Sequence, residues 1–232
     1  MQTKSAKELL AEKALEFVRD GAVIGLGSGS TAKAFIEALG RLAAATGIRP
    51  ILVATSVDSE LKAIEVGLGP YLRPLWAVDS IDLAVDGADE VTRDRVFLKG
   101  RGGALLREKV VDYRASTLLI LAEARKLVPS IPHGNPIPIE VVPVAWRHVA
   151  RDIERKFGGR CVLRTAESGR LGPHVTDNGN YIIDWTPPSP VDAEFLELAL
   201  KEVPGVIETG IFARRKDAVV LLADEGTAVR PL

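Results

Sequence analysis

The 232-residue sequence predicts an α/β fold in which a doubly wound, mostly parallel sheet is accompanied by a second, smaller α+β domain. Short apolar runs alternate with helical segments from residue 5 to residue 121, which is typical of a parallel sheet. Five prolines then fall between residues 129 and 143 and indicate a domain boundary or an ordered linker. Beyond them, the order strand, helix, strand, strand, helix, strand is that of a split, ferredoxin-like arrangement.

The first half of the sequence is expected to form the parallel sheet. Ser5 and Glu8 match a capping box, so a helix should begin there, and Asp20-Gly21 should end it. Apolar runs bounded by glycine and polar residues give the strands, and helical periodicity gives the connections. The expected strands are 22–26, 51–54, 81–85, 96–98 and 117–121, and the expected helices between them are 31–45, 56–66 and 103–111.

The second half predicts the smaller domain. Residues 218–223 return to a buried-strand pattern and can rejoin the first sheet. We therefore expect a Rossmann-like catalytic domain of residues 1–130 plus 214–232, and a ferredoxin-like lid or interface domain of residues 131–213. The expected strands of the smaller domain are 139–142, 160–164, 181–185 and 206–212, and its expected helices are 144–157 and 191–202.

Composition excludes several classes of partner. The net charge is −1 at pH 7, so no overall attraction to nucleic acid or to an anionic membrane is expected. The single cysteine, Cys161, excludes an intrachain disulfide and is expected to pack in the core. The N-terminal segment lacks the apolar run of a signal peptide, and no apolar run is long enough to span a bilayer. These features suit a reducing, cytoplasmic location.

Four polar segments follow expected strands of the first sheet, and two of them are rich in glycine. Ligands of open parallel sheets bind beyond the carboxyl ends of the strands, so we expect these segments to meet at one edge. An anionic ligand would have to be held by such a local site, because the chain as a whole is almost neutral. The four segments are residues 27–31, 86–90, 99–103 and 123–126.

The segment Gly-Ser-Gly-Ser-Thr at residues 27–31 suits a phosphate group. Its glycines let the backbone approach an anion, its hydroxyls donate, and the following helix offers N–H groups at its start. A tight turn capped by Ser30 or Thr31 would give the same pattern. The segment is not a Walker A loop, and its match to a dinucleotide fingerprint is incomplete because no acidic residue follows at the required distance.

Acidic residues follow the third strand. Asp86 and Asp89 flank Gly87-Ala88, so their carboxylates can converge on one ligand and accept hydrogen bonds from sugar hydroxyls. The same pair could hold Mg²⁺. Aspartate is also common in ordinary turns, which is the alternative interpretation.

Two further residues are candidates for proton transfer and charge stabilisation. Lys99 precedes a glycine-rich turn and could stabilise an oxyanion. Glu108 lies on the following helix and could be a general base if it faces the site. Taken alone, Glu108 is more typical of an exposed helix residue, because charged residues flank it on both sides.

The remaining ionisable residues are less informative. Lys7 and Lys126 are solvated lysines by default, although either could reach a phosphate. The histidines His133, His148 and His174 include no pair with metal-ligand spacing, so neither a metal site nor a histidine base is expected.

Six stretches of the sequence, in order, closely resemble the signatures of ribose-5-phosphate isomerase type A. The resemblance runs from about residue 5 to about residue 225, and it covers both expected domains. The first three signatures are residues 25–32 (GLGSGSTA), 85–91 (VDGADEV) and 98–109 (LKGRGGALLREK), and the second-domain signatures are residues 138–141, 176–180 and 204–212.

The resemblance implies an isomerase without cofactor or metal that interconverts ribose 5-phosphate and ribulose 5-phosphate through an enediolate, in the pentose phosphate pathway. It implies that Glu108 moves the proton between C2 and C1 and that Lys99 stabilises the enediolate oxygen. It implies that Asp86 and Asp89 bind hydroxyls and assist ring opening. A homo-oligomer, either dimer or tetramer, is implied as well. The implied substrate-binding residues are Lys7, Ser28, Gly29, Ser30, Thr31, Asp86, Gly87, Ala88, Asp89, Lys99, Gly100, Arg101, Gly102 and Lys126.

The sequence departs from the family pattern at four places. Ser28 stands where the family usually has threonine, and Glu123 where it usually has aspartate. Arg101 replaces a usual glycine, so its side chain must point out of the turn that follows Lys99. The loop of residues 165–174 is longer than the family pattern leads us to expect.

Two other functions remain open on the sequence alone. An enzyme of related fold, such as a glucosamine-6-phosphate isomerase-like or acyl-CoA transferase-like protein, would turn over another substrate. A non-catalytic sugar-phosphate sensor of the kind found in transcription regulators would need a DNA-binding module, whereas only residues 1–21 precede the first expected strand.

Overall fold

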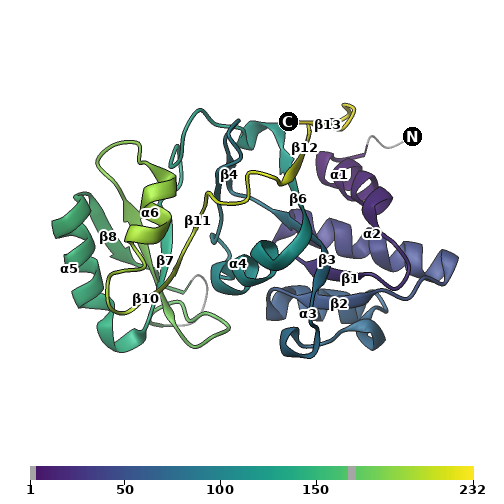
Figure 1. Cartoon of the computed structure of the whole chain (residues 1–232), viewed down its shortest axis with the longest axis horizontal. Coiled ribbons are helices and arrows are strands. Elements are labelled where there is room, and N and C mark those ends of the chain that lie inside the picture. The colour runs from purple at the N-terminus through teal and green to yellow at the C-terminus, as the bar shows by residue number, and fades with distance from the viewer. Residues whose placement is uncertain (1–3, 167–170) are drawn as a thin grey trace. The chain divides into compact units, whose positions relative to one another are not determined.

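The structure is a computed structural model that describes residues 4–166 and 171–232 (Figure 1). It divides into two compact units, each with its own sheet and its own apolar core. The long loop expected at residues 165–174 includes residues 167–170, which lie outside the described residues. The first unit comprises Met1–Ala88, Arg107–Leu127 and Asp217–Leu232, and the second unit comprises Asp89–Leu106 and Val128–Lys216.

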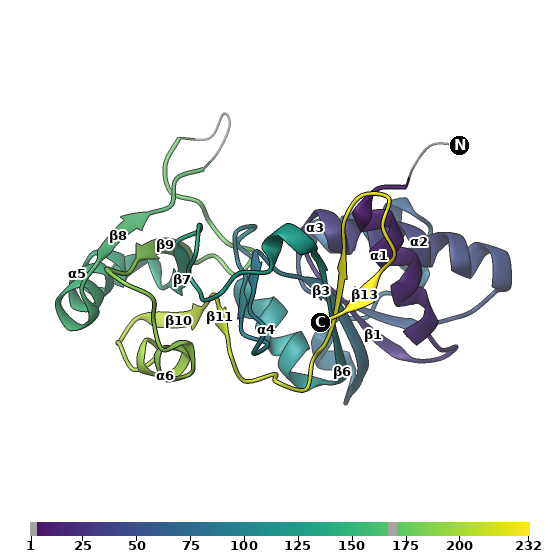
Figure 2. The same cartoon turned by 90° about the horizontal axis from the view of Figure 1, so that it is seen from above.

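The first unit is built on a six-stranded sheet with the order β13-β12-β6-β3-β1-β2. All neighbouring strands are parallel except β12 and β13, as the alternation of short apolar runs with helices predicts. In Figure 2 the C-terminal segment, in yellow, returns to this sheet, where β12 pairs with β6 as expected. The strands are β1 (Val23–Leu26), β2 (Ile51–Ala54), β3 (Ile81–Gly87), β6 (Ala115–Glu123), β12 (Val219–Ala223) and β13 (Arg230–Pro231).

Helices cover both faces of the six-stranded sheet. Ile24 and Leu26 of β1 lie in a core with residues of α1 and α2, whereas Gly25 between them faces the other side, against Val111 of α4. The expected capping box forms at the start of α1, where Ser5 Oγ accepts from the N–H of Glu8. The helices are α1 (Ala6–Ala14), α2 (Ser30–Thr46), α3 (Val57–Glu65) and α4 (Leu105–Arg114), with 3₁₀ turns η1 (Leu15–Phe17), η2 (Gly69–Tyr71), η3 (Leu75–Ala77) and η4 (Ala124–Lys126).

The second unit has a four-stranded antiparallel sheet with the order β10-β7-β9-β8. Its chain order and strand order are those of the split arrangement that the sequence predicts. Alternate residues of β7 point into a core with α5 and α6, and the residues between them point to the opposite face of the sheet. The elements are β7 (Ile137–Val141), η5 (Pro143–Ala145), α5 (Trp146–Phe157), β8 (Arg160–Leu163), β9 (Tyr181–Thr186), α6 (Ala193–Ala199) and β10 (Val206–Thr209).

A third, small antiparallel sheet in the second unit corrects three predictions. Its strands are β11 (Ile211–Phe212), β5 (Phe97–Leu98) and β4 (Glu90–Val91), in that order. The strand expected at 96–98 therefore does not join the parallel sheet. The single strand expected at 206–212 is two strands in two sheets, because Gly210 interrupts it. The segment 89–106 consequently belongs to the second unit rather than to the first domain, where it was expected.

The helix expected from residue 103 begins two residues later, at Leu105. Gly103 has a φ of +83°, a conformation outside the helical region that glycine adopts at little cost. Within the described part of the chain, no helix is both long and apolar enough to cross a membrane.

Candidate active site

The loop between β1 and α2 has the features of an anion site. Gly29 is the N-cap of α2 and has a φ of +87°. Glycine has no side chain with which to cap the first N–H groups of the helix, so the interpretation of Ser30 or Thr31 as the cap is wrong. The positive end of the α2 dipole and its first N–H groups therefore point at the space beyond the loop, the arrangement that favours phosphate.

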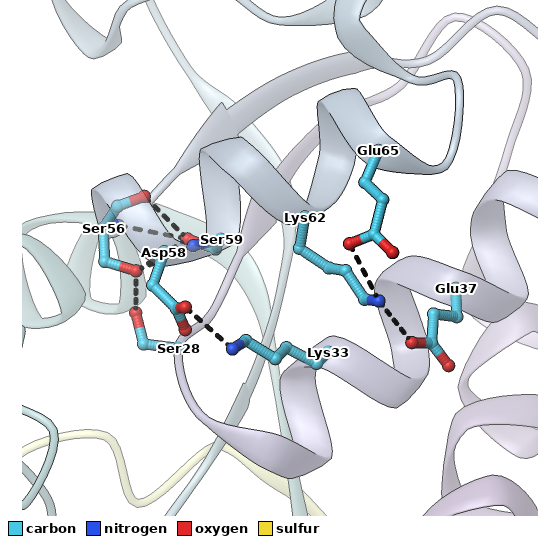
Figure 3. Close-up of polar contacts among 8 residues, drawn as sticks. All are labelled: Ser28, Lys33, Glu37, Ser56, Asp58, Ser59, Lys62 and Glu65. Atoms are coloured by element: carbon cyan, nitrogen blue, oxygen red, sulfur yellow. Dashed lines mark hydrogen bonds and ion pairs between the residues drawn. The ribbon is translucent and has the colours of Figure 1, made fainter.

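Hydroxyl groups from the end of β2 fix Ser28. Ser28 Oγ lies 2.8 Å from Thr55 Oγ1. It donates to Ser56 Oγ at 2.7 Å, as Figure 3 shows. Ser56 in turn caps α3 in a reciprocal pair with Ser59. Thr55 and Ser56 are not among the site residues expected from the sequence. Their position directly after a strand of the parallel sheet could have identified them, because all residues that follow parallel strands lie at the carboxyl edge of the sheet.

Ion pairs brace α2 against α3 beside this loop. Lys33 Nζ lies 2.7 Å from Asp58 Oδ1 (Figure 3). Lys62 contacts Glu37 at 2.6 Å and Glu65 at 3.2 Å, and hydrogen bonds to both carboxylates raise the pKa of Lys62. The ammonium groups of Lys33 and Lys62 therefore already have carboxylate partners, either on the neighbouring helix or on the same helix.

Asp86 lies directly beneath the anion loop at the end of β3. It is 1% exposed, and its Oδ1 accepts the N–H of Ser28 at 3.1 Å and of Gly87 at 2.6 Å. A Cβ on Gly27 would lie 2.2 Å from this carboxylate, so only glycine fits there. Thr31 also belongs to this group, because a Cβ on Gly87 would lie 3.8 Å from Thr31 Cβ.

Strand alternation places Asp86 on the face of the sheet that α4 covers. Val85 belongs to the core on the α1 and α2 side, so Asp86 points the other way. On that side a Cβ on Gly25 would lie 2.4 Å from Val111 Cγ1, which shows how closely α4 packs on β1.

Glu108 is part of this closely packed face of α4. It lies three residues before Val111, so both occupy the same side of the helix. Because α4 leads directly into β6, it runs from the carboxyl edge of the sheet to the amino edge, and Glu108 is the nearer of the two to the carboxyl edge. Glu108 is 5% exposed. The alternative of an exposed helix residue is therefore wrong.

Lys7 and Lys126 lie on the other side of the same edge, around Glu123. Lys126 Nζ donates to the carbonyl of Ala88 at 2.6 Å, and Lys7 Nζ is 3.9 Å from Glu123 Oε1. Burial alone would raise the pKa of Glu123, but Arg125, Lys7 and Lys126 together hold it below its usual value. Neither lysine is simply solvated: Lys126 is half-buried against the end of β3, and Lys7 is partly buried on α1.

Asp89 and Lys99 belong to the second unit. Asp89 Oδ2 accepts the N–H of Arg101 at 3.0 Å, and the N–H of Asp89 donates to the carbonyl of Leu98 at 2.8 Å. Lys99 is 2% exposed, and its Nζ lies 5.4 Å from the centre of the Phe212 ring, within cation–π range. The expectation that residues 99–103 follow a strand of the parallel sheet is wrong, because they follow β5.

The turn after Lys99 is glycine-dependent. Gly100 has a φ of +97° and Gly103 of +83°, both in the region that favours glycine. Gly102 and Arg101 are exposed, which fits the outward direction that the arginine requires. The implied site residues are thus divided between the units, with residues 7, 28–31, 86–88, 108 and 126 in the first and residues 89 and 99–102 in the second.

Glu90 is a further residue that sequence analysis missed. Its buried carboxylate accepts the N–H groups of His133, Gly134 and Asn135 at 2.7–2.9 Å and the Asn135 side-chain amide at 2.9 Å. A buried carboxylate must be paired in this way. The proline-rich segment is therefore an ordered connection anchored beside Asp89.

Other reactive groups are remote from this chemistry. Burial and the nearby Glu154 raise the pKa of Cys161 to about 12, so the thiolate that would act as a nucleophile is scarce at neutral pH. Among the described residues, no group of three or more His, Cys, Asp and Glu side chains is placed to hold a metal ion.

Comparison with known proteins identifies the family. The family model of ribose 5-phosphate isomerase A (phosphoriboisomerase A) matches residues 51–226. The chain is 42% identical over 227 residues to the ribose-5-phosphate isomerase A of Pyrococcus horikoshii, and the match covers 97% of each protein.

Solved structures agree with this result. The ribose 5-phosphate isomerase A structure from Methanocaldococcus jannaschii matches with a TM-score of 0.90 at 38% identity, over 98% of this chain and 97% of the other. A D-ribose-5-phosphate isomerase in complex with phospho-erythronic acid matches with a TM-score of 0.91 at 41% identity, over 100% of this chain and 99% of the other. With both expected folds present and the match extending over the whole length, the chain belongs to the ribose 5-phosphate isomerase A family.

Proposed function

We propose that Glu108 is the general base with which this chain interconverts ribose 5-phosphate and ribulose 5-phosphate. The reaction moves one proton between adjacent carbons, so a single carboxylate that removes it from C2 and returns it to C1 suffices. The observation that carries the assignment is the burial of Glu108 on the sheet-facing side of α4, toward the edge where Asp86 lies. A solvent-exposed glutamate on the outer side of α4 would not be directed toward this edge.

The 27–31 loop takes the phosphate group in this proposal. The start of α2 supplies N–H groups, Ser28, Ser30 and Thr31 supply hydroxyls, and Lys7 and Lys126 supply positive charge. The phosphate does not react. Its binding energy holds the open-chain sugar in place while the proton moves at the other end.

Lys99 stabilises the enediolate oxygen, and Asp86 and Asp89 bind sugar hydroxyls and assist ring opening. As C2 loses its proton, negative charge develops on the C1 oxygen, and a buried ammonium group stabilises that charge more than it stabilises the uncharged carbonyl of the aldose. The complex of a related D-ribose-5-phosphate isomerase with phospho-erythronic acid supports a sugar-phosphate substrate for this site. That ligand carries a phosphate and a carboxylate, and the carboxylate resembles the planar, negatively charged enediolate.

The family resemblance also supports a homo-oligomer, dimer or tetramer, acting in the cytoplasm. The oligomer is tested by light scattering after gel filtration at micromolar concentration. A monomer under these conditions would contradict this part of the proposal without affecting the assignment of Glu108.

The central experiment is an isomerase assay in the presence of EDTA. We expect the wild-type chain to convert ribose 5-phosphate to ribulose 5-phosphate with chelator present. Glu108→Gln should lower kcat by about 10²–10⁴-fold, the usual contribution of a general base. The variant should still bind phospho-erythronic acid, measured by calorimetry, because the amide is nearly isosteric with the carboxylate.

Glu60→Gln on the exposed side of α3 is the matched control and should leave kcat unchanged. A Glu108→Gln variant with full activity would contradict the role of Glu108. Turnover of an amino sugar phosphate but not of the pentose phosphate would contradict the substrate.

A further inference from the structure

Arg164 is tied to the turn that follows Lys99. It lies one residue beyond β8, on the face of the four-stranded sheet opposite the core with α5 and α6. Its Nη1 donates to the carbonyl of Gly100 at 3.0 Å and to the carbonyl of Arg101 at 3.0 Å. One guanidinium nitrogen thus contacts two consecutive carbonyls of a glycine-rich turn.

The other side of the guanidinium is held by Asp184 on β9. Arg164 Nε donates to Asp184 Oδ2 at 2.8 Å, and Nη2 donates to Asp184 Oδ1, so the pair is bidentate. Both side chains are mostly buried, at 16% and 19% exposed. Bidentate pairing fixes the plane of the guanidinium, so the direction in which Nη1 points at the turn is fixed as well.

The turn rests on the same face of the sheet. A Cβ on Gly100 would lie 3.4 Å from Pro138 Cβ, and a Cβ on Gly103 would lie 3.3 Å from Ile182 Cδ1 and 2.5 Å from His174 Nε2. Packing therefore leaves no room for the turn to shift toward the sheet. Glycines have no side chains with which to hold the turn, and Arg164 supplies hydrogen bonds to its backbone.

The turn has two ends that matter for the chemistry. At one end Lys99 precedes Gly100 directly. At the other, the N–H of Arg101 donates to the Asp89 carboxylate at 3.0 Å. Arg164 binds the carbonyls of the two peptide units that flank the Arg101 Cα. It therefore fixes the backbone that follows Lys99 and the backbone whose N–H binds Asp89.

We propose that Arg164, oriented by Asp184, is a positioning residue that fixes the turn holding Lys99 and Asp89 for the isomerisation. This inference rests on the roles proposed above for these two residues. Arg164 acts through the backbone of the turn and makes no bond in the reaction. A misplacement of about 1 Å at a reacting group can cost on the order of 10²-fold in rate, so the contact has a measurable consequence.

Three variants test the inference. Arg164→Met removes both carbonyl contacts and should lower kcat by about 10-fold to 10²-fold. Arg164→Lys keeps the charge but lacks the planar fork, so it should recover part of that loss. Asp184→Asn keeps Arg164 but weakens the bidentate pair that orients it, and should give a smaller loss than Arg164→Met.

Arg155→Met is the matched control. Arg155 pairs with Asp152 on α5 of the same unit at 2.8 Å, and both side chains are more exposed than those of Arg164 and Asp184. Loss of this Arg–Asp pair should leave kcat and KM unchanged. The comparison separates the specific contact with the turn from the general loss of a salt bridge.

The second readout is hydrogen–deuterium exchange, which does not depend on activity. In Arg164→Met, the peptide that contains the Arg101 N–H should exchange faster, while peptides from α5 and β7 should exchange at the wild-type rate. The KM for ribose 5-phosphate should rise at most a few-fold, because the proposed phosphate site lies in the other unit. A purely structural role would instead raise exchange throughout the second unit.

Failure of this inference can be distinguished from failure of the proposed function. If the wild-type chain does not isomerise, the exchange measurement still decides whether Arg164 orders the turn. If Arg164→Met is too unstable to study, Arg164→Lys and Asp184→Asn are measured in the same way. Wild-type kcat and wild-type exchange of the Arg101 peptide in a folded Arg164→Met or Arg164→Lys variant would overturn the inference.

Discussion

Asp86 and Asp89 are three residues apart, yet the structure supports them in different ways. Asp86 ends a strand of the six-stranded sheet, is almost fully buried, and accepts N–H groups from Ser28 and Gly87. Asp89 belongs to the second unit and accepts the N–H of Arg101 from a glycine-rich turn. One carboxylate is positioned by the edge of a sheet and the other by a loop.

The difference shows two ways to build a site from one chain. Residues at the carboxyl ends of parallel strands are positioned by the sheet itself, so few additional contacts are needed. Residues on an irregular turn need contacts that fix the backbone, and here Arg164 and Gly210 make them. We therefore expect mutations near the first carboxylate to act through packing and those near the second to act through hydrogen bonds to the turn.

The largest effect in this comparison is expected for the lysine of the second unit. Lys99→Met should lower kcat by about 10²–10³-fold, because it removes the positive charge proposed for the enediolate oxygen. KM should change less than kcat, since the charge develops only during the reaction. Steady-state assays with Lys156→Met, an exposed lysine of α5, as control would measure it. Equal losses in both variants would show that the effect is not specific to Lys99.

Gly27→Ala tests the rigid edge of the first unit. The added Cβ would lie 2.2 Å from the Asp86 carboxylate and 2.6 Å from Asp86 Cα, so the strand end must shift. We expect kcat to fall by about 10-fold to 10²-fold through displacement of Asp86. Gly69→Ala in the same unit, where the new Cβ meets Ile64 at an ordinary 3.5 Å, should have no effect on kcat. A wild-type kcat for Gly27→Ala would argue against Asp86 as a site residue.

The smallest effect is expected at Glu123, beside Lys7 and Lys126. Nearby Arg125, Lys7 and Lys126 lower its pKa despite burial, so it is charged at neutral pH and competes with a phosphate for the lysines. Glu123→Gln should lower KM by about 2-fold to 3-fold at low ionic strength, as expected for a partly exposed charge. Raising the salt concentration should remove the difference. A higher KM in low salt would contradict the placement of the phosphate near these lysines.

The same pKa shift predicts a pH dependence of stability. A carboxylate whose pKa is lower in the folded state contributes stability above its unfolded pKa, and this contribution is lost as the pH falls through the folded value. The difference in Tm between the wild-type chain and Glu123→Gln should therefore be present at neutral pH and shrink below about pH 4, near the ordinary glutamate value.

The parallel sheet and the split arrangement were predictable because their signals are local. Apolar runs, glycine turns and the capping box at Ser5 each lie within a few residues, and the structure places them as expected except for the strands at 96–98 and 206–212. The small sheet was not predictable in this way. Two-residue strands such as β4 and β5 carry too little pattern to reveal their partners, and β11 pairs with β5 only because Gly210 ends β10.

The candidate site was suggested by its glycines and acids, whereas the residues that support it were not predictable from the sequence. Sequence patterns identified the 27–31 loop, and family resemblance assigned Glu108, whose burial follows from the packing of α4 on β1. Arg164 lay at the end of an expected strand, where nothing in the pattern indicates a contact 63 residues away in the chain. The polar residues of the 176–180 signature also make a contact distant in the chain: Thr176, Asn178 and Asn180 all donate to the buried carboxylate of Glu140.

Gly210 has a consequence for the order in which the chain can fold. Its N–H donates to the carbonyl of Pro138 at 2.7 Å, and its carbonyl accepts from the N–H of Lys99 at 2.9 Å. A Cβ at this position would lie 2.3 Å from the Lys99 carbonyl, so no other residue can replace it. The segment around Lys99 is thus completed by residues made about 110 positions later, and long-range pairings of this kind form slowly. During synthesis on the ribosome, β5 can pair with β4 early, but its other edge stays open until β11 has emerged, so chaperones that shield exposed strand edges have their longest opportunity to act there.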